Sequence, residues 1–121
     1  MGPIEMDFNN TMTIAQNQSL SGAIDLKGLT AVGFICPAAI EATTVALYFF
    51  ASSTLAGTYT AVKRAGAGLK LTFAVNDYGL MTTPDDLLGV RFLKIQASIA
   101  DGTAVAQATA ARVFTVIAYD L

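Results

Sequence analysis

Short runs of alternating apolar and polar residues recur about every ten residues along the chain, and turn-forming residues separate them. This spacing is typical of an all-β sandwich or barrel, and no stretch keeps the period of an amphipathic helix. We therefore expect an all-β fold: a single antiparallel, jelly-roll-like β-sandwich of about eight or nine strands. The predicted strands are residues 11–15, 19–26, 29–36, 43–51, 58–64, 69–75, 78–82, 90–99 and 112–119.

Three segments depart from this pattern. The N-terminal segment contains Pro3 and little periodicity, so we expect an extended arm over residues 1–10 and the sandwich domain over residues 11–121. Residues 83–89 combine a capping Thr, a Pro, two acids and a closing Gly, which predicts one short helical turn. Residues 100–111 are rich in Ala, a weak strand former, and should form a loop or a loose edge.

The residue types present exclude several kinds of catalytic and metal site. The chain has no His and a single Cys, so it cannot build a Ser-His-Asp or Cys-His arrangement or a structural zinc site. The start of the predicted helical turn explains the paired acids Asp85 and Asp86, and no further acid with metal-ligand spacing accompanies them. We therefore expect no enzymatic activity, no cofactor and no metal. Cys36 lies in an apolar run and should be a small buried side chain.

The charge pattern argues against two classes of partner. The seven Lys and Arg residues are scattered and the formal net charge is −2, so we expect no nucleic-acid binding. Turn residues interrupt the longest uncharged stretch, residues 42–62, which therefore reads as two strands and a turn and not as a membrane helix. Because 54% of the residues are hydrophobic, the chain has enough apolar surface to fold.

A few polar and aromatic residues are candidates for ligand binding. Arg91 is expected to pair with an acid in a loop. A polar groove of Asn76, Asp77, Tyr78 and Arg91 could bind a sugar, although nothing in the spacing requires one. Tyr59 and Tyr78, both near turns, are the candidate rings on which a sugar would stack.

Several strand-and-turn phrases occur in an order that resembles a known family. The phrases are Leu20-Ser21-Gly22-Ala23-Ile24-Asp25-Leu26, Val32-Gly33-Phe34, Cys36-Pro37-Ala38-Ala39, Leu47 with Phe49 and Ala51-Ser52, Gly57-Thr58-Tyr59, and Leu88-Gly89-Val90-Arg91-Phe92-Leu93-Lys94-Ile95. Together they resemble a family of small β-sandwich proteins encoded among the virion-morphogenesis genes of tailed bacteriophages. The resemblance covers residues 11–119.

The resemblance implies a virion structural protein, foremost a capsid decoration or cement protein that binds and stabilises the assembled head. Its partner would be the major capsid protein, and its location would be the capsid surface of the virion after synthesis in the host cytoplasm. The alternative is a carbohydrate-binding β-sandwich on a tail or fibre that takes part in host recognition.

Three apolar residues occupy positions where the resemblance leads us to expect outward-facing polar residues: Ile35, Tyr48 and Phe50. A strand that is apolar on both sides is either covered by a loop or arm of its own chain or lies at an interface. Both alternatives stay open. The second predicts a homo-oligomer, with a trimer favoured, because closed assemblies let a small domain bury surplus apolar area.

The N-terminal arm is the other candidate for contact. Ile4, Met6 and Phe8 alternate within it, so the segment could add a strand to the sheet edge of a neighbour. The alternative is a disordered terminus. The predicted subunit or capsid interface therefore consists of Ile4, Met6, Phe8, Ile35, Tyr48 and Phe50.

Overall fold

The computed structural model describes residues 11–41, 43–64, 66–73, 78–81, 83 and 86–119. The interface predictions for Ile4, Met6 and Phe8 lie outside these described residues, as do Asn76 and Asp77 of the predicted polar groove. Within the described ranges, no helix is long and apolar enough to cross a membrane.

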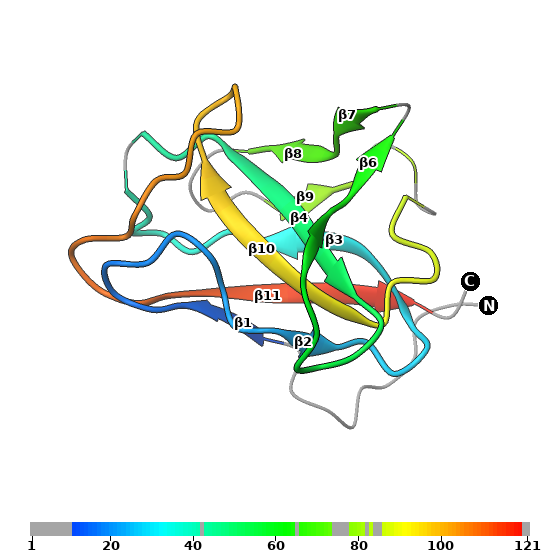
Figure 1. Ribbon diagram of the computed structural model, residues 1–121. Helices are drawn as coiled ribbons and strands as arrows, with labels where there is room; N and C mark the ends of the chain where they lie inside the picture. Colours follow the sequence, from blue (N-terminus) through cyan, green and yellow to red (C-terminus); the bar gives the residue numbers. More distant parts are fainter. Residues whose placement is uncertain are drawn as a thin grey trace.

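Two antiparallel sheets stack face to face and confirm the predicted β-sandwich (Figure 1). Sheet A has the order β1-β11-β3-β9 and consists of β1 (Thr11–Ile14), β11 (Arg112–Tyr119), β3 (Thr30–Ile35) and β9 (Tyr78–Leu80). Sheet B has the order β2-β10-β4-β5, with β8 also paired to β4, and consists of β2 (Ile24–Asp25), β10 (Phe92–Ser98), β4 (Ala46–Ser52), β5 (Thr60–Ala61) and β8 (Lys70–Thr72). A separate small hairpin joins β6 (Lys63–Arg64) to β7 (Ala67–Gly68).

The core lies between the two sheets, where the long strands β10 and β4 cross over β11 and β3 (Figure 1). Alternation along β10 and β11 places their apolar residues inward, as the sequence predicts. The buried residues of these two strands include Leu93, Ile95, Ala97, Phe114, Val116 and Ala118. The rings of Phe34 in β3 and Phe49 in β4 have centroids 5.4 Å apart, so an aromatic contact joins the two sheets.

The single cysteine belongs to this core. Cys36 directly follows β3, and only 4% of its surface is exposed, which confirms the prediction of a buried side chain. Its Sγ donates a hydrogen bond to the carbonyl of Pro37 at 3.6 Å.

Residues 19–26, predicted as one strand, pair with both sheets and form only the short strand β2. The backbone N–H of Ser21 donates to the carbonyl of Ile95 at 2.9 Å, and that of Gly22 donates to the carbonyl of Thr13 at 3.1 Å. The Ser21 hydroxyl also accepts the Ile95 N–H at 2.9 Å, so it replaces a backbone carbonyl in the ladder. The segment therefore ties β1 of sheet A to β10 of sheet B along one side of the sandwich.

Residues 58–64, also predicted as one strand, divide into β5 and β6. β5 pairs with β4, whereas β6 pairs with β7. The change occurs at Val62, whose N–H donates to the carbonyl of Phe49 and whose carbonyl accepts the N–H of Leu69. The chain therefore leaves the edge of β4 after β5 and forms the β6–β7 hairpin. It then returns to the same strand, because β8 pairs with the first part of β4.

The described part of residues 83–89 contains hydrogen-bonded turns in place of the predicted helical turn. The N–H of Asp86 donates to the carbonyl of Thr83 at 3.1 Å, and that of Val90 donates to the carbonyl of Leu87 at 3.2 Å. Gly89 has a φ of 86°, a left-handed conformation that suits a Gly at the end of a turn.

The alanine-rich stretch 100–111 is a loop, one of the two predicted alternatives, and a buried glutamine holds it in place. The Gln107 side chain is fully buried. Its Nε2 donates to Thr44 Oγ1 and to the carbonyl of Val105, each at 3.2 Å, while its Oε1 accepts the N–H of Glu41 at 2.9 Å. These bonds satisfy the buried amide and connect the loop to the segment that precedes β4.

Candidate interaction surface

The outward-facing side chains of sheet A form an uncharged face, which we call the outer A face. Strand alternation places these side chains on the side opposite the core. The register aligns them in two rows across the strands, Thr11–Thr115–Ile35–Tyr78 and Ile117–Gly33–Leu80. The face consists of Thr11, Thr13, Gly33, Ile35, Tyr78, Leu80, Val113, Thr115 and Ile117.

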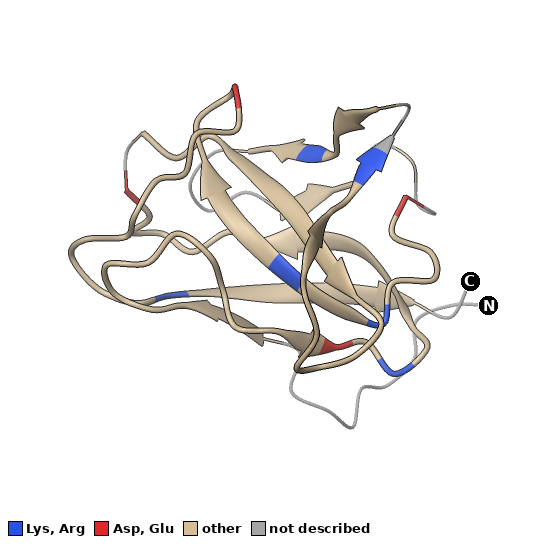
Figure 2. Cartoon of the chain, viewed as in Figure 1, with Lys and Arg blue, Asp and Glu red and all other residues tan. Residues whose placement is uncertain are grey.

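Several large apolar side chains of the outer A face are open to solvent. Tyr78 is 63% exposed, Leu80 59% and Val113 48%. Charged residues are scattered over the molecule (Figure 2), and none of the residues that form this face is charged. Exposed apolar side chains grouped on one face make it a candidate interaction surface.

A glycine makes the middle of the outer A face continuous. A Cβ at Gly33 would lie 2.7 Å from the carbonyl oxygen of Gly79, which is closer than real Cβ atoms approach. It would also lie 2.9 Å from Leu80 Cδ2 and 3.2 Å from Ile117 Cδ1. The two neighbouring side chains therefore fill the space that Gly33 leaves, and they join the two edges of the face.

The outer face of sheet B differs because the chain covers part of it. The Tyr48 hydroxyl donates to the carbonyl of Ala100 at 2.9 Å, and Lys70 Nζ donates to the same carbonyl at 2.9 Å. The Tyr48 ring lies 3.4 Å from the position of a Cβ at Gly102 and 3.3 Å from that at Gly68. A loop and a hairpin of the same chain thus enclose this ring.

An aspartate shapes the covering loop. Asp101 Oδ1 accepts the N–H of Thr103 at 2.9 Å. This backbone hydrogen bond, with smaller help from the Thr103 hydroxyl, holds the pKa of Asp101 below its usual value.

Charged and aromatic side chains lie beside Tyr48 on sheet B. Phe50 is half-buried and stands opposite Lys94 in the register of β4 and β10. Lys94 Nζ lies 4.4 Å from the centroid of the Tyr59 ring, a cation–π contact. The Tyr59 hydroxyl donates to the carbonyl of Leu55 at 2.9 Å, and burial raises the pKa of Tyr59.

The structure therefore separates the predicted interface residues that it describes. Ile35 belongs to the outer A face, where it is half-buried. Tyr48 and Phe50 lie on the opposite side of the sandwich. For Tyr48, cover by the chain's own loop, the first of the two alternatives, is what the structure contains. Leu80 and Val113 are not among the predicted interface residues, although each is an apolar residue in an outward position of a regular alternation.

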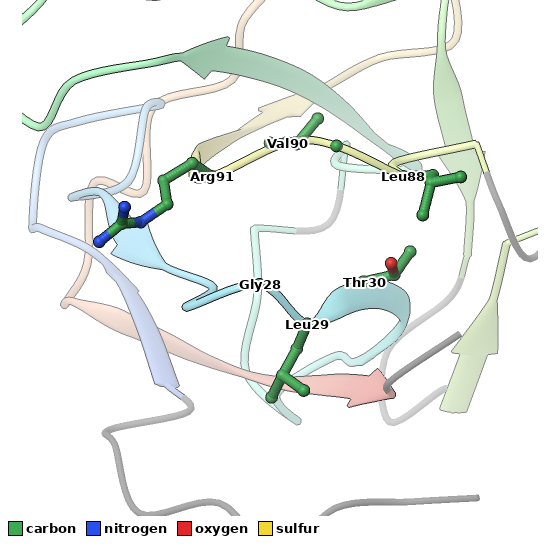
Figure 3. Close-up of a pocket in the computed structure, with 7 residues that line it drawn as sticks. Gly28, Leu29, Thr30, Leu88, Val90 and Arg91 are labelled. Atoms are coloured by element: carbon green, nitrogen blue, oxygen red, sulfur yellow. The ribbon is translucent and has the colours of Figure 1, made fainter. Parts of the chain in front are cut away.

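A pocket of about 300 Å³ lies between the start of β3 and the segment that precedes β10 (Figure 3). It is lined by residues 28–30 and 88–91. In Figure 3 the side chains of Leu88 and Thr30 approach each other across it, whereas Arg91 points away at the other end. Since Arg91 is the one charged residue among the described residues of the lining, the pocket suits a small apolar group.

Arg91 pairs with an acid, as the sequence predicts. Its Nε donates to Asp25 Oδ1 at 2.8 Å and its Nη2 donates to Asp25 Oδ2 at 3.2 Å. Asp25 Oδ1 also accepts the N–H of Lys27 at 2.9 Å. The hydrogen bond from Arg91, followed by that from Lys27, holds the pKa of Asp25 below its usual value. The guanidinium also stacks 5.0 Å from the centroid of Phe92.

The described residues of the predicted sugar groove do not converge. Tyr78 belongs to sheet A, whereas Arg91 precedes β10 of sheet B and binds Asp25. Tyr59 and Tyr78, the candidate stacking rings, also belong to opposite sides, and the Tyr59 ring already contacts Lys94. No group of three or more potential metal ligands occurs among the residues that the structure describes.

Comparisons of the chain with family models, with curated proteins and with solved structures gave no match. We therefore infer function from the surfaces of the molecule itself. Among the surfaces formed by the residues that the structure describes, the outer A face combines exposure, apolar character and lack of charge.

Proposed function

We propose that this chain is a structural protein of tailed-bacteriophage virions that binds the assembled head as a decoration or cement protein. Support comes from the strand-and-turn phrases over residues 11–119 and from the β-sandwich that they form. A role in assembly needs surfaces that become buried only when partners are present. It needs no catalytic group.

The observation that carries the proposal is the outer A face. Leu80 and Tyr78 are each more than half exposed on a sheet face without charge. Burial of apolar surface contributes roughly 25 cal/mol per Å², so such a face favours association. A protein that binds only the assembled head stabilises it by mass action, because the bound form is removed from the equilibrium with free subunits.

Immunogold electron microscopy of the virions whose genome encodes this chain tests the proposal. We expect label over the heads at many sites per particle. Label on tails or fibres would support the carbohydrate-binding alternative, and virions without label would overturn a virion role altogether.

Carbohydrate binding has weaker support. Sugars are held by stacking on exposed rings, and Tyr78 is the one large exposed aromatic residue in the described part of the chain. A glycan array probed with the full chain distinguishes the two roles: specific binding that a Tyr78→Ala variant loses would favour host recognition over decoration.

A further inference from the structure

The last part of β11 has an edge that no described strand covers. β1 pairs with residues 112–115 of β11, whereas β3 pairs with residues 115–119 on the opposite side. Among the described residues, no strand pairs with residues 116–119 on the side of β1. We propose that residues 7–10 of the same chain bind this edge and continue β1 along β11. The inference goes beyond the proposed function and does not depend on it.

The hydrogen bonds of β1 show which backbone groups of this edge need a partner. The Thr13 carbonyl accepts the N–H of Gly22 at 3.1 Å, on the edge of β1 away from β11. Successive residues of a strand direct their backbone groups to opposite edges, so the residues on either side of Thr13 bind β11. The same alternation along β11 turns the N–H and C=O of Val116 and Ala118 toward the uncovered edge. Both residues are buried, at 1% and 2% exposed, and a further strand would satisfy these buried groups.

The chain enters the sheet beside this edge. Thr11, the first residue of β1, lies opposite Thr115, and each step back along β1 corresponds to one step forward along β11. The same register would place residues 10, 9, 8 and 7 opposite residues 116, 117, 118 and 119. β11 stays regular over this range, because the extra residue of the bulge, Val32, belongs to β3. No turn is needed to bring the segment to the edge.

The alternation of the arm agrees in phase with that of β1. Met12 and Ile14 face the core, whereas Thr13 is exposed. Counting back from Met12 in steps of two gives Asn10, Phe8, Met6 and Ile4, and the residues between them are Asn9, Asp7 and Glu5. A continued strand would therefore direct the three apolar side chains inward and the acids outward. A shift of one residue would direct the acids into the core, so the pattern specifies this register.

The neighbours of Phe8 in this register would be small. Phe8 would lie opposite Ala118, which in turn lies opposite Ala31 of β3. Both alanines belong to the core, at 2% and 0% exposed. A large ring beside two small side chains is the kind of complementarity that fills a core without voids.

The chain's own arm is a better occupant of this edge than the arm of a second copy. An edge of this kind can accept a strand from a neighbour, as the sequence suggests for the arm. The chain's own residues 7–10 are joined directly to β1, however, so their effective concentration at the edge exceeds that of a separate copy. A covered edge also protects the sheet from association with other edges.

Disulfide cross-linking of the full chain tests the inference. Residues 9 and 117 would form a non-hydrogen-bonded pair, whose Cα atoms lie about 4.5 Å apart and within disulfide range. We expect Asn9→Cys with Ile117→Cys to form an intramolecular disulfide roughly tenfold faster, or more, than Asn9→Cys with Val113→Cys. Val113 is the matched control, because it is also an outward residue of β11 but lies opposite Thr13. Cys36 is buried and does not compete.

Three outcomes of this experiment would overturn the inference, and mass spectrometry with non-reducing gels separates them. Equal rates for the two pairs would mean that the arm does not hold this register. Disulfide-linked dimers would mean that the arm binds a second copy. No cross-link would mean that the edge is not the site of the arm.

Amide hydrogen exchange, followed by NMR in the full chain, examines the same contact without added cysteines. The N–H groups of Val116 and Ala118 should exchange slowly, and Phe8→Ala should accelerate their exchange roughly tenfold or more. The N–H of Ile117 faces β3 and should stay slow, which shows that the variant keeps its fold. Asp7→Ala, at an outward position, is the control and should leave all three rates unchanged.

Fast exchange at Val116 and Ala118 in the original chain would contradict the inference, as would slow exchange that Phe8→Ala does not alter. These results are independent of the immunogold test. An arm bound to its own sheet is compatible with label on heads, on tails or on neither, and label on heads is compatible with an arm that lies elsewhere.

Discussion

The two outer faces of this sandwich differ in how far the chain itself covers them. On sheet B, a hairpin and a loop of the same chain enclose Tyr48, and Lys70 and Lys94 supply charge nearby. On sheet A, Leu80 and Tyr78 stay open and no charged residue belongs to the face. The same alternation rule produces both faces, so strand pattern alone does not decide which apolar residues are left for a partner. The connections between strands decide it.

Loss of the Gln107 side chain, which holds the covering loop in place, should cause the largest decrease in stability. Gln107→Ala deletes the three hydrogen bonds of a buried side-chain amide and leaves the N–H of Glu41 without its acceptor. We expect a loss of about 2–4 kcal/mol in the free energy of unfolding, measured by urea denaturation. Gln16→Ala is the control, because exposed Gln16 binds the carbonyls of Ala108 and Thr109 in the same loop. A Gln107→Ala variant as stable as Gln16→Ala would mean that sheet B keeps its cover without this amide.

Adding a side chain at Gly33, in the middle of the outer A face, should cause the second-largest decrease in stability. Gly33→Ala forces a Cβ against the backbone oxygen of Gly79 and should push β9 away from β3. We expect a destabilisation of about 1–3 kcal/mol by urea denaturation. Gly22→Ala, where no atom lies within 4 Å of the added Cβ, should change stability by less than about 0.5 kcal/mol. Equal effects at the two glycines would contradict the tight approach at Gly33.

The Tyr48 hydroxyl, which binds the loop that covers sheet B, should contribute less to stability. Tyr48→Phe removes the hydrogen bond to Ala100 but keeps the enclosed ring. We expect a destabilisation of about 0.5–1.5 kcal/mol, measured by thermal unfolding. Tyr78→Phe, on the open face, should leave the unfolding temperature unchanged. If Tyr78→Phe cost as much as Tyr48→Phe, the difference between the faces would not hold.

The ion pair beside the pocket should have the smallest effect, and one that depends on pH. Because Arg91 and Lys27 lower the pKa of Asp25, the carboxylate stabilises the fold above the ordinary Asp pKa of 3.8. That contribution is lost as the pH falls through the lower pKa of the folded state. Asp25→Asn should therefore lower the unfolding temperature by at most a few degrees at pH 7 and not at all in strong acid. Arg91→Gln should show the same pH dependence, and the double variant should add nothing further.

The strands that could be predicted from the sequence are those with a regular alternation and a single partner on each side. β11 has the predicted bounds, since its alternation is unbroken from Arg112 to Tyr119. Residues 58–64 alternate as regularly, yet the chain changes partner at Val62. The alternation of apolar and polar residues does not contain this change, because it shows which face a residue occupies and not which strand lies beside it.

The candidate surface could be predicted only in part for the same reason. Ile35, Tyr48 and Phe50 stood out as apolar residues in outward positions, but the pattern does not say which sheet each strand joins. Gln107 lies in a stretch that looks like an ordinary loop, and its burial depends on Glu41 and Thr44, more than sixty positions away. The pairing of Arg91 with an acid was predicted and is confirmed, although the partner, Asp25, is in a strand.

The buried position of Cys36 makes its thiol a probe of local and global opening of the fold. Cys36 is 4% exposed directly after β3, so a thiol reagent can reach it only when the sandwich opens locally or globally. With one thiol in the chain, every labelled molecule records the same opening event. The rate of labelling under native conditions therefore measures how often the structure around Cys36 opens, and it should fall when a bound partner stabilises sheet A.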